Sequence, residues 1–334
     1  MNKKTFISIL LLLFLSILAG CEEETESSDS NGITTTIKGG RTGGAWAVFT
    51  EGIAESVRRE NDSSYITVEP GSIVENPPMV GLGRVPYGLS YAMTAYAAYR
   101  GVEPYDQAFE NIRAVSVVIP ANYYQFFVRK DVPYDSLHDI VENQIPIRLA
   151  VNQKGSDAEL ITRETFHHFG ITYENIISWG GSVDYLSGSK AFEMMADGRI
   201  DAAGNAESAP SGNIIEASTT IDLKMVSLDK ETIETVSEKL GMEPNTIPAG
   251  TYDFQKEDID TVSTPAILIV HKDVSDEEVY AVTKSIYNNL NYLQTVHDEF
   301  KELTEESMIN VGELPLHPGA EKFYKDIGIL AKDE

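Results

Sequence analysis

The sequence TTTIKGGRTGGAWAVFTEGIAESV, residues 34–57, decides the fold class of this chain. Its first five residues are rich in β-branched side chains, which favour a β-strand. The glycine-rich loop Gly39–Gly44 follows, where the backbone can turn sharply and a ligand can approach its N–H groups closely. A strand, a glycine loop and a helix in this order predict an α/β unit. The apolar side chains at helical spacing are Val48, Phe49, Ile53 and Val57.

The alternation of strand and helix patterns continues along the chain. Short apolar runs rich in β-forming residues are separated by helical patterns, which predicts an α/β fold with mainly parallel sheets. The predicted strands are Thr34–Lys38, Ser64–Glu69, Tyr87–Ser90, Ile112–Ile119, Gln125–Arg129, Ile147–Val151, Ile176–Ser178, Ala202–Asn205 and Leu223–Val226.

Three predicted helix starts follow strands in a similar way, at Gly43-Gly44, at Ser72 and at Gly155-Ser156. Ser156-x-x-Glu159 is a capping box, and the helix it opens should stop at Gly170. In open α/β sheets, ligands bind beyond the carboxyl ends of the strands. Helix N-termini there offer free N–H groups and a positive dipole end, so we expect a site suited to carboxylates or phosphates.

The C-terminal part of the chain has a different pattern. Ser275-x-x-Glu278 is a further capping box. It precedes apolar residues at helical spacing that predict one long helix, packed across one lobe. These residues are Val279, Val282, Ile286, Leu290 and Leu293.

The N-terminus has the marks of a bacterial secretory signal. Two lysines precede an apolar run, Phe6–Leu18, and small residues lead to Cys21. Leu18-Ala19-Gly20-Cys21 resembles the lipoprotein signal, which implies cleavage before Cys21 and acylation of its thiol. The alternatives are a plain signal peptide and a membrane helix, but a span needs roughly 20 apolar residues. We therefore expect a lipid-anchored protein on the extracytoplasmic face of the cell membrane.

The amino-acid composition limits the number of domains and the kinds of partner and site that the chain can have. The 334 residues suit two domains of ordinary size, and 42% hydrophobic residues suffice for real cores. The net charge of −26 repels nucleic acid and anionic lipid, and solubility is its simplest explanation. Cys21 is the only cysteine, which excludes a disulfide framework and a thiolate zinc site. The acidic, serine-rich segment Glu22–Gly32 reads as a disordered tether.

Three motifs suggest enzyme chemistry, and each is incomplete. Gly88–Ala92 approaches a hydrolase nucleophile elbow built on Ser90, but its trailing glycine is replaced by Ala92. Ser187-x-x-Lys190 lacks the partner motifs of penicillin-binding enzymes, and His167-His168 has no spaced partner for a metal. We therefore predict no catalytic residue, no metal and no cofactor. A two-lobed binding protein fits the convergent loops better than an enzyme does.

Several segments, taken in order, resemble the TAXI family, the solute-binding subunits of one class of TRAP transporters. The resemblance begins with the glycine loop and its flanking strand and helix, and together the segments cover nearly all of residues 33–328. The further segments are Val68–Gly71 with Asn76, Arg113–Val115 through to Arg129, Gly155-Ser156, Asp197–Ala202, Ile247–Tyr252, Val279–Lys284 and Pro315–Ala320.

The resemblance implies a two-lobed fold of the type II periplasmic-binding-protein kind, with ligand held between lobes joined by crossing strands. The expected organisation is a signal peptide over residues 1–20 and a lipidated tether over residues 21–32. The first lobe would comprise residues 33–119 and 264–334, and the second lobe residues 120–263.

The resemblance also implies the partners. The ligand would be a small carboxylate of the glutamate, glutamine or 2-oxoglutarate class, delivered to TRAP membrane permease subunits driven by an ion gradient. The protein would act as a monomer, contact the membrane through its lipid anchor only, and bind no nucleic acid. A binding subunit of an ATP-driven (ABC) importer, a sensory receptor of the same fold, and a serine hydrolase built on Ser90 are the alternatives.

The ligand-binding positions implied by the resemblance lie on strand ends, loops and helix starts, where a ligand belongs. They are Thr42, Gly43, Gly44, Ala45, Trp46, Asn76, Ser90, Tyr91, Tyr124, Gly155, Ser156, Asp157, Ala158 and Asn205.

Some positions depart from the family pattern. Trp46 stands where the loop often has Tyr or Phe, and Ile73 stands where the residue is often small or hydroxylated. The turn Gly83–Tyr87 lacks the usual acidic residues, which could alter docking to the permease. Arg41 and Lys154 flank the proposed loops and are the basic side chains best placed to meet a carboxylate, although either could simply be solvated.

Overall fold

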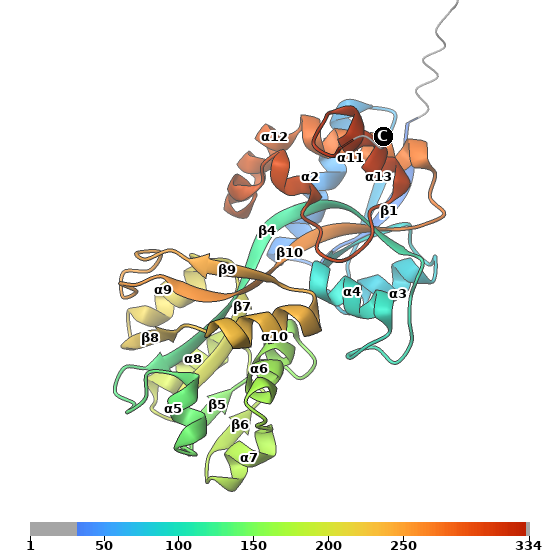
Figure 1. Ribbon diagram of the computed structural model, residues 1–334. Helices are drawn as coiled ribbons and strands as arrows, with labels where there is room; N and C mark the ends of the chain where they lie inside the picture. Colours follow the sequence, from blue (N-terminus) through green and yellow to red (C-terminus); the bar gives the residue numbers. More distant parts are fainter. Residues whose placement is uncertain (1–31, 332–334) are drawn as a thin grey trace, which may run out of the picture.

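The computed structural model describes residues 32–331. The predicted signal peptide, Cys21 and the tether up to residue 31 lie outside the described residues. Within residues 32–331, the helices are all too short or too polar to cross a membrane. The chain folds into two lobes, with the N-terminal and C-terminal parts together in one of them (Figure 1).

The first lobe contains three strands near the N-terminus, and β1 lies between the other two in parallel register. Its helices come from both ends of the described chain, as Figure 1 shows. The elements are β1 (Thr34–Lys38), α2 (Ala45–Glu60), β2 (Tyr65–Glu69), α3 (Asn76–Gly81), β3 (Tyr87–Tyr91), α4 (Ala92–Arg100), α11 (Asp276–Asn288), α12 (Leu290–Val296), η1 (Asp298–Glu302), η2 (Glu306–Ile309) and α13 (Pro318–Asp326).

The second lobe repeats the strand–helix alternation, with β5 parallel to both β6 and β7. Its elements are α5 (Leu137–Glu142), β5 (Arg148–Ala150), α6 (Asp157–His168), α7 (Tyr173–Ser178), β6 (Ser182–Asp184), α8 (Gly188–Ala196), β7 (Ala202–Glu207), α9 (Gly212–Ser218), β8 (Leu223–Val226), α10 (Lys230–Leu240) and β9 (Glu243–Ile247).

Two long antiparallel strands, β4 (Ile112–Arg129) and β10 (Ile259–His271), run from one lobe into the other (Figure 1). They join all strands into one sheet of order β2-β1-β3-β10-β4-β7-β5-β6, with β8 beside β4 and β9 beside β10. Their register shifts between the pairs Ala266–Ile119 and Thr264–Asn122. Pro265 therefore faces Pro120 and Ala121, and proline interrupts a ladder because it has no N–H. The crossing strands are irregular where the lobes meet.

The predicted fold class is confirmed: the chain is an α/β protein of two lobes joined by crossing strands. The expected mainly parallel pairing is wrong, because both crossing strands pair with all their neighbouring strands in antiparallel register. The apolar core is also divided between the two lobes. One cluster fills the first lobe, and two clusters on opposite faces of the sheet fill the second lobe. Tyr91 packs against the first-lobe core and against the second-lobe core under α6. The end of β3 therefore lies at the contact between the lobes.

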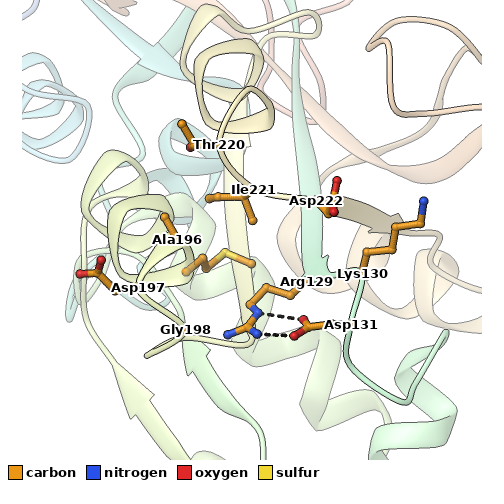
Figure 2. A pocket seen from close by; sticks show the side chains of 10 residues that line it. Arg129, Lys130, Asp131, Ala196, Asp197, Gly198, Thr220, Ile221 and Asp222 are labelled. Atoms are coloured by element: carbon orange, nitrogen blue, oxygen red, sulfur yellow. Dashed lines mark hydrogen bonds and ion pairs between the residues drawn. The ribbon is translucent and has the colours of Figure 1, made fainter.

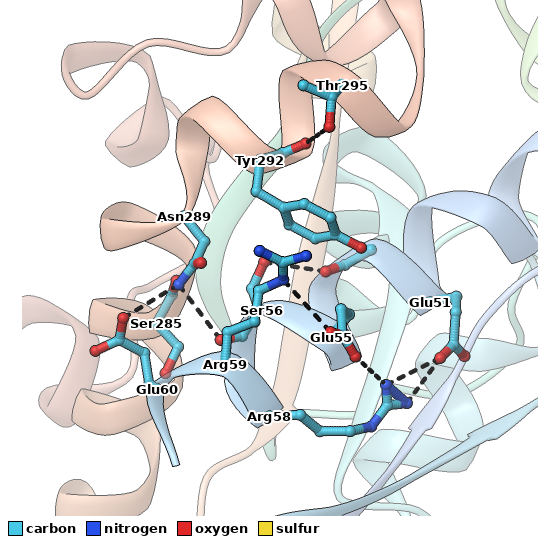
Figure 3. A network of polar contacts seen from close by, with 11 residues as sticks. Glu51, Glu55, Ser56, Arg58, Arg59, Glu60, Ser285, Asn289, Tyr292 and Thr295 are labelled. Carbon is cyan, nitrogen blue, oxygen red and sulfur yellow. Dashed lines mark hydrogen bonds and ion pairs between the residues drawn. The ribbon is translucent and has the colours of Figure 1, made fainter. Parts of the chain in front are cut away.

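Helices α2 and α12 are joined by a polar network (Figure 3). The guanidinium of Arg58 reaches Glu51 at 2.7 Å, and that of Arg59 lies 3.7 Å from the centre of the Tyr292 ring. The side-chain amide of Asn289 donates to Glu60 at 3.2 Å. Asn289 also separates α11 from α12. The predicted single helix over this region is therefore wrong, because the chain leaves the helical conformation at Asn289 and continues as a second helix.

Two other local predictions differ from the structure. Ile176–Ser178, predicted as a strand, is the end of α7, which begins with a capping box between Thr172 and Asn175. The predicted strands 112–119 and 125–129 are one continuous strand, β4. Both errors arise because short apolar runs do not distinguish a strand from a helix turn, and prolines do not necessarily end a strand at a sheet crossover.

Candidate functional site

The glycine loop and the start of α2 form a cavity on the first lobe. Its volume is about 230 Å³. It lies beyond the carboxyl end of β1, where ligands bind in α/β sheets. The lining residues are Gly40, Arg41, Gly44, Ala45, Trp46, Gly71, Ser72 and Ile73.

The N-terminus of α2 carries no side-chain cap. Gly44 is the N-cap residue, and no side chain accepts a hydrogen bond from the first turn. The first N–H groups of an α-helix have no partner within the helix, so those of Ala45 and Trp46 can bind an external acceptor. Gly43 sits at φ +81°, a conformation that L side chains rarely adopt. The loop therefore leaves the helix end open toward the cavity.

Asn76 holds this loop in place from behind. It is fully buried, and its amide nitrogen donates to the carbonyl oxygens of Gly39 at 2.9 Å and Leu89 at 2.7 Å. Its side-chain oxygen accepts from the N–H of Ser72. A Cβ on Gly71 would lie 2.2 Å from that oxygen, so glycine is required there. All polar atoms of Asn76 are used by the backbone, which makes it a positioning residue.

Ser90 has a similar structural role. It is fully buried, and its hydroxyl donates to the carbonyl oxygen of Ile73 at 3.2 Å. This bond ties the end of β3 to the loop that lines the cavity. The hydroxyl therefore faces a backbone oxygen of the protein rather than a histidine base, as a nucleophile elbow would need.

Trp46 and Tyr91 form an aromatic pair beside the cavity. Their ring centres lie 4.9 Å apart at 82°, an edge-to-face contact. Burial raises the pKa of Tyr91 well above its usual value, and the nearby carboxyls of Asp157, Glu299 and Glu207 raise it further. The charges that act on this tyrosine therefore come from three other parts of the chain.

The N-terminus of α6 in the second lobe is capped by a side chain, whereas the N-terminus of α2 is not. Ser156 is the N-cap residue, and its hydroxyl accepts a hydrogen bond from the N–H of Glu159 at 3.3 Å. The carboxylate of Glu159 in turn accepts from the N–H of Gly155 at 3.0 Å. One half of the predicted capping box is formed, the bond from the N–H of Glu159 to the hydroxyl of Ser156. Side chains of the protein therefore already bind part of the N-terminus of α6.

Asp157 is the first residue of α6. Its carboxylate accepts a hydrogen bond at 3.1 Å from the amide of Asn122 on the crossing strand β4. Burial raises the pKa of Asp157 to about 6, against the lowering effects of the N–H of Ala158 and of Asn122. The position at a helix N-terminus favours a negative charge, so desolvation here outweighs the helix dipole.

A chain of hydrogen bonds ends on a second, half-buried carboxyl, Glu207 at the end of β7. The amide of Asn152 donates to Asn205 at 2.9 Å, and the amide of Asn205 donates to Glu207 at 2.9 Å. The hydroxyl of Ser211 donates to the other carboxylate oxygen. Burial raises the pKa of Glu207 even with these donors.

Glu299 contributes the third carboxyl, from η1 in the first lobe. Burial raises its pKa, whereas His297 and a hydrogen bond to Ser208 of the second lobe lower it. We call the region where the lobes meet the inter-lobe junction; its residues are Trp46, Tyr91, Asn122, Asp157, Glu207 and Glu299.

The structure brings only some of the predicted site residues together: Gly44, Ala45 and Trp46 line the first-lobe cavity, and Trp46 contacts Tyr91. Tyr124 lies in the core of the second lobe, and its hydroxyl donates to Thr162 at 3.0 Å. Ala158 is buried in α6. The other predicted residues at loops, helix starts and strand ends of the two lobes are Thr42, Gly43, Gly155, Ser156, Asp157 and Asn205.

Three junction residues were not predicted from the sequence. Glu207 follows Asn205 by two residues on a strand, which places both on one face, so period-two spacing could have identified it. Asn122 and Glu299 carry no comparable signal, because only the crossing of β4 and the return of the C-terminal segment bring them to the junction.

A larger hollow of about 550 Å³ lies at the other end of the second lobe (Figure 2). Arg129 donates there to Asp131, with Nε 2.9 Å from the carboxylate. Ala202, the first residue of β7, pairs with Val128 at this end, so the hollow lies away from the carboxyl ends of the parallel strands. A ligand site is not expected at that edge. Within residues 32–331, no group of three His, Cys, Asp or Glu side chains could hold a metal ion.

Solved structures share this fold at low sequence identity. PhnD1 of Prochlorococcus marinus, in complex with methylphosphonate, is 9% identical over 89% of this chain and 99% of its own, with a TM-score of 0.52. XAC2383 of Xanthomonas citri, bound to ATP, is 11% identical over 90% of this chain and 97% of its own, with a TM-score of 0.52.

The periplasmic aliphatic sulphonate binding protein SsuA of Escherichia coli is 13% identical over 81% of this chain and 72% of its own, with a TM-score of 0.42. At the level of sequence, the model of the NMT1-like family matches residues 37–328, which include both lobes and the whole junction. The chain therefore belongs to the NMT1-like family.

Proposed function

We propose that this protein is an extracytoplasmic solute-binding protein that captures a small carboxylate between its lobes and delivers it to the permease of a TRAP transporter, as TAXI-family subunits do. The observation that carries the proposal is the cavity on the first lobe, where Arg41 and the uncapped N-terminus of α2 meet. Membership of the NMT1-like family and the two-lobed fold support it.

The ligand docks first on the open helix end. Its carboxylate accepts hydrogen bonds from the N–H groups of Ala45 and Trp46, and the guanidinium of Arg41 supplies a charge-assisted bond. A carboxylate that leaves water must find such partners, or its desolvation opposes binding. The neutral N–H groups and the arginine together meet that requirement.

Closure of the lobes then buries the ligand against the second lobe. The hinge lies where Pro120 and Ala121 face Pro265, because the ladder between the crossing strands is irregular there. We place the boundary between the lobes at this point, near residues 119–121 and 264–265. The closed form presents a surface that the permease recognises, and the acylated Cys21 keeps the protein beside the membrane.

The first test is a thermal-shift screen of small carboxylates and amino acids. A bound ligand stabilises the folded protein by about 2.7 kcal/mol at a hundredfold excess over Kd, so a true ligand raises the Tm measurably. Calorimetry then gives the affinity. A rise in Tm with sugars or metal cations, and with none of the carboxylates, would contradict the proposal.

The role of the cavity is tested with Arg41→Ala. Loss of a charge-assisted hydrogen bond corresponds to about 1.5–3 kcal/mol, so affinity should fall by roughly tenfold to a hundredfold. Arg84→Ala is the matched control, since Arg84 is also an exposed arginine of the first lobe but does not line the cavity. Equal effects of the two variants would place the carboxylate elsewhere.

The transport system is tested by uptake. Vesicles that contain a TRAP permease should accumulate the ligand only with this protein present and an ion gradient applied. Uptake that instead requires ATP hydrolysis would assign the protein to an ABC importer. Replacing Cys21 by Ser should release the protein from the membrane fraction if the thiol is acylated.

A further inference from the structure

The cavity on the first lobe has one charged side chain and mostly apolar walls. Of the described residues that line it, three are glycines, and the others are Arg41, Ala45, Trp46, Ser72 and Ile73. Among these lining residues of the described chain, none carries a carboxylate, a side-chain amide or an imidazole. The guanidinium of Arg41 can meet one negative charge, but Ala45 and Ile73 have no polar side-chain atom, and the indole of Trp46 has a single N–H donor.

The two largest apolar side chains of the cavity are held in position by the protein. The carbonyl oxygen of Ile73 accepts a hydrogen bond from the buried hydroxyl of Ser90 at 3.2 Å. The carbonyl oxygen of Trp46 accepts from the hydroxyl of Thr50 at 2.6 Å, and the indole packs edge-to-face against Tyr91. A surface that is ordered before binding loses little freedom when a ligand arrives. Trp46 and Ile73 therefore form a preorganised apolar surface.

The cavity volume limits the size of the apolar group that can bind. An apolar cavity of about 150 Å³ can hold benzene. With about 230 Å³, the first-lobe cavity can hold a group of that size together with a carboxylate. The apolar surface also continues along α2, because Val48 follows Ala45 by three residues on the same helix face and is 41% exposed. Exposed apolar surface of this kind favours the burial of a hydrocarbon group.

We propose that the ligand is a monocarboxylate with an apolar body about the size of benzene, and that Trp46 and Ile73 select it. The inference rests on the proposed function and narrows its ligand class. The carboxylate binds Arg41 and the open end of α2, and the hydrocarbon body lies against the two apolar side chains. A second carboxylate in that place would lose its hydration without gaining a cation, which makes succinate and 2-oxoglutarate poor ligands.

Calorimetry with two matched pairs of acids tests the ligand class on the purified protein. Succinate and 4-methylpentanoate have the same number of heavy atoms and nearly the same shape, but an isopropyl group replaces one carboxylate. 2-Oxoglutarate and 5-methyl-2-oxohexanoate form a second pair of this kind. We expect the apolar member of each pair to bind more tightly by roughly tenfold or more, because an unpaired charge is harder to desolvate than an isopropyl group.

The outcome separates the inference from the proposed function. If succinate, 2-oxoglutarate or glutamate binds as tightly as the apolar acids or more tightly, the inference is overturned and the proposed function stands. If every carboxylate fails in the thermal-shift screen and in calorimetry, both are overturned.

Ile73→Thr tests one apolar side chain directly. Threonine is also β-branched, so the fold should persist, as circular dichroism can verify. The affinity for 4-methylpentanoate should fall by roughly fivefold to tenfold, because apolar contact surface is lost, whereas that for succinate should not fall. Ile327→Thr is the matched control, since Ile327 follows α13 in the same lobe and does not line the cavity. Equal changes in the two variants would show that Ile73 does not contact the ligand.

Trp46→Phe tests the other apolar side chain through the length of the ligand. The smaller ring enlarges the cavity, so 5-methylhexanoate should gain on 4-methylpentanoate by roughly fourfold, the effect of one additional buried methylene. The chain has two tryptophans, and Trp179→Phe at the end of α7 in the second lobe is the matched control. It should leave the ratio of the two affinities unchanged. An unchanged ratio in Trp46→Phe would mean that Trp46 does not limit the apolar body of the ligand.

Discussion

The two lobes share one motif, a strand followed by a glycine-containing loop and a helix. They differ in how the N-terminus of that helix is capped. In the first lobe, α2 begins at Gly44 without a side-chain cap, beside Arg41. In the second lobe, Ser156 caps α6, and Asp157 adds a carboxyl. One helix end is free to bind an anion, and the other is already satisfied and acidic. A shared motif therefore does not imply a shared preference for ligand charge.

The largest expected effect concerns the loop supports of the two lobes. Asn76→Ala should destabilise the protein by about 3 kcal/mol or more, because the buried carbonyls of Gly39 and Leu89 lose their donor. Tyr124→Phe in the second lobe removes the hydroxyl that bonds to Thr162, with an expected effect of about 1 kcal/mol. Urea unfolding measures both. Similar losses in the two variants would mean that the first-lobe loop is not held by Asn76.

The second prediction concerns the stability effect of the acidic helix start. The pKa of Asp157 is raised to about 6 from its ordinary 3.8, so its charged form destabilises the folded state. This destabilisation is absent at pH values below the ordinary pKa of 3.8, and it is complete at pH values well above 6. Asp157→Asn should therefore raise the free energy of unfolding of the ligand-free protein at pH 7.5 by roughly 1–3 kcal/mol, with little effect near pH 3.5.

The matched control for that measurement is Asp139→Asn in α5. The N–H groups of Asp135 and Ser136 donate to Asp139, and such bonds lower its pKa. Neutralising it should lower stability at pH 7.5, the reverse sign. If Asp157→Asn also lowers stability at neutral pH, the carboxylate is better satisfied in the folded state than its surroundings indicate.

The third prediction exchanges the two helix caps. Ser156→Ala should destabilise the protein by about 1 kcal/mol because α6 loses its cap. Gly44→Ser should change stability by only a few tenths of a kcal/mol, but it should weaken ligand binding, since the new hydroxyl competes for the N–H groups of α2. Thermal unfolding and calorimetry separate the two effects. Unchanged affinity in Gly44→Ser would indicate that the ligand does not use that helix end.

The smallest expected effect concerns a contact that joins the lobes away from the junction. Arg163 of α6 lies 2.9 Å from Glu103, which follows α4 in the first lobe and is exposed. Exposed ion pairs contribute about 0–1 kcal/mol and weaken with salt. Glu103→Gln should therefore change the Tm slightly at low ionic strength and not at 1 M salt. A large, salt-insensitive effect would identify this pair as a structural link between the lobes.

The positions of strands and helix starts were largely predictable. The predicted strands Thr34–Lys38 and Leu223–Val226 have the same bounds in the structure. Ser275 caps α11 through the N–H of Glu278 as its spacing predicts. Gly170, the predicted end of α6, follows the helix at φ +71°. These features depend on residues within a few positions of one another, so local sequence suffices.

The charge of the side chains at the site could not be predicted from local sequence. Helix starts and glycine loops indicated an anion site, and the first lobe retains that character. The acidic side of the junction depends on Glu207 and Glu299, which belong to different lobes, together with Asp157. No short motif relates residues so far apart along the chain. Burial then altered their proton affinity, a property that only the surrounding structure sets.

The sequence by itself determined the elements of this protein, because β-branched runs, glycine loops and capping residues act on their own neighbours through backbone geometry and hydrogen bonds. The tertiary structure alone decided what each polar side chain does. It buried Asn76 and Ser90 as supports of a loop, placed Tyr124 in a core, and joined Asp157 to Asn122 of the crossing strand β4. These outcomes depend on desolvation and on hydrogen bonds between distant segments, and both arise only when the chain is folded.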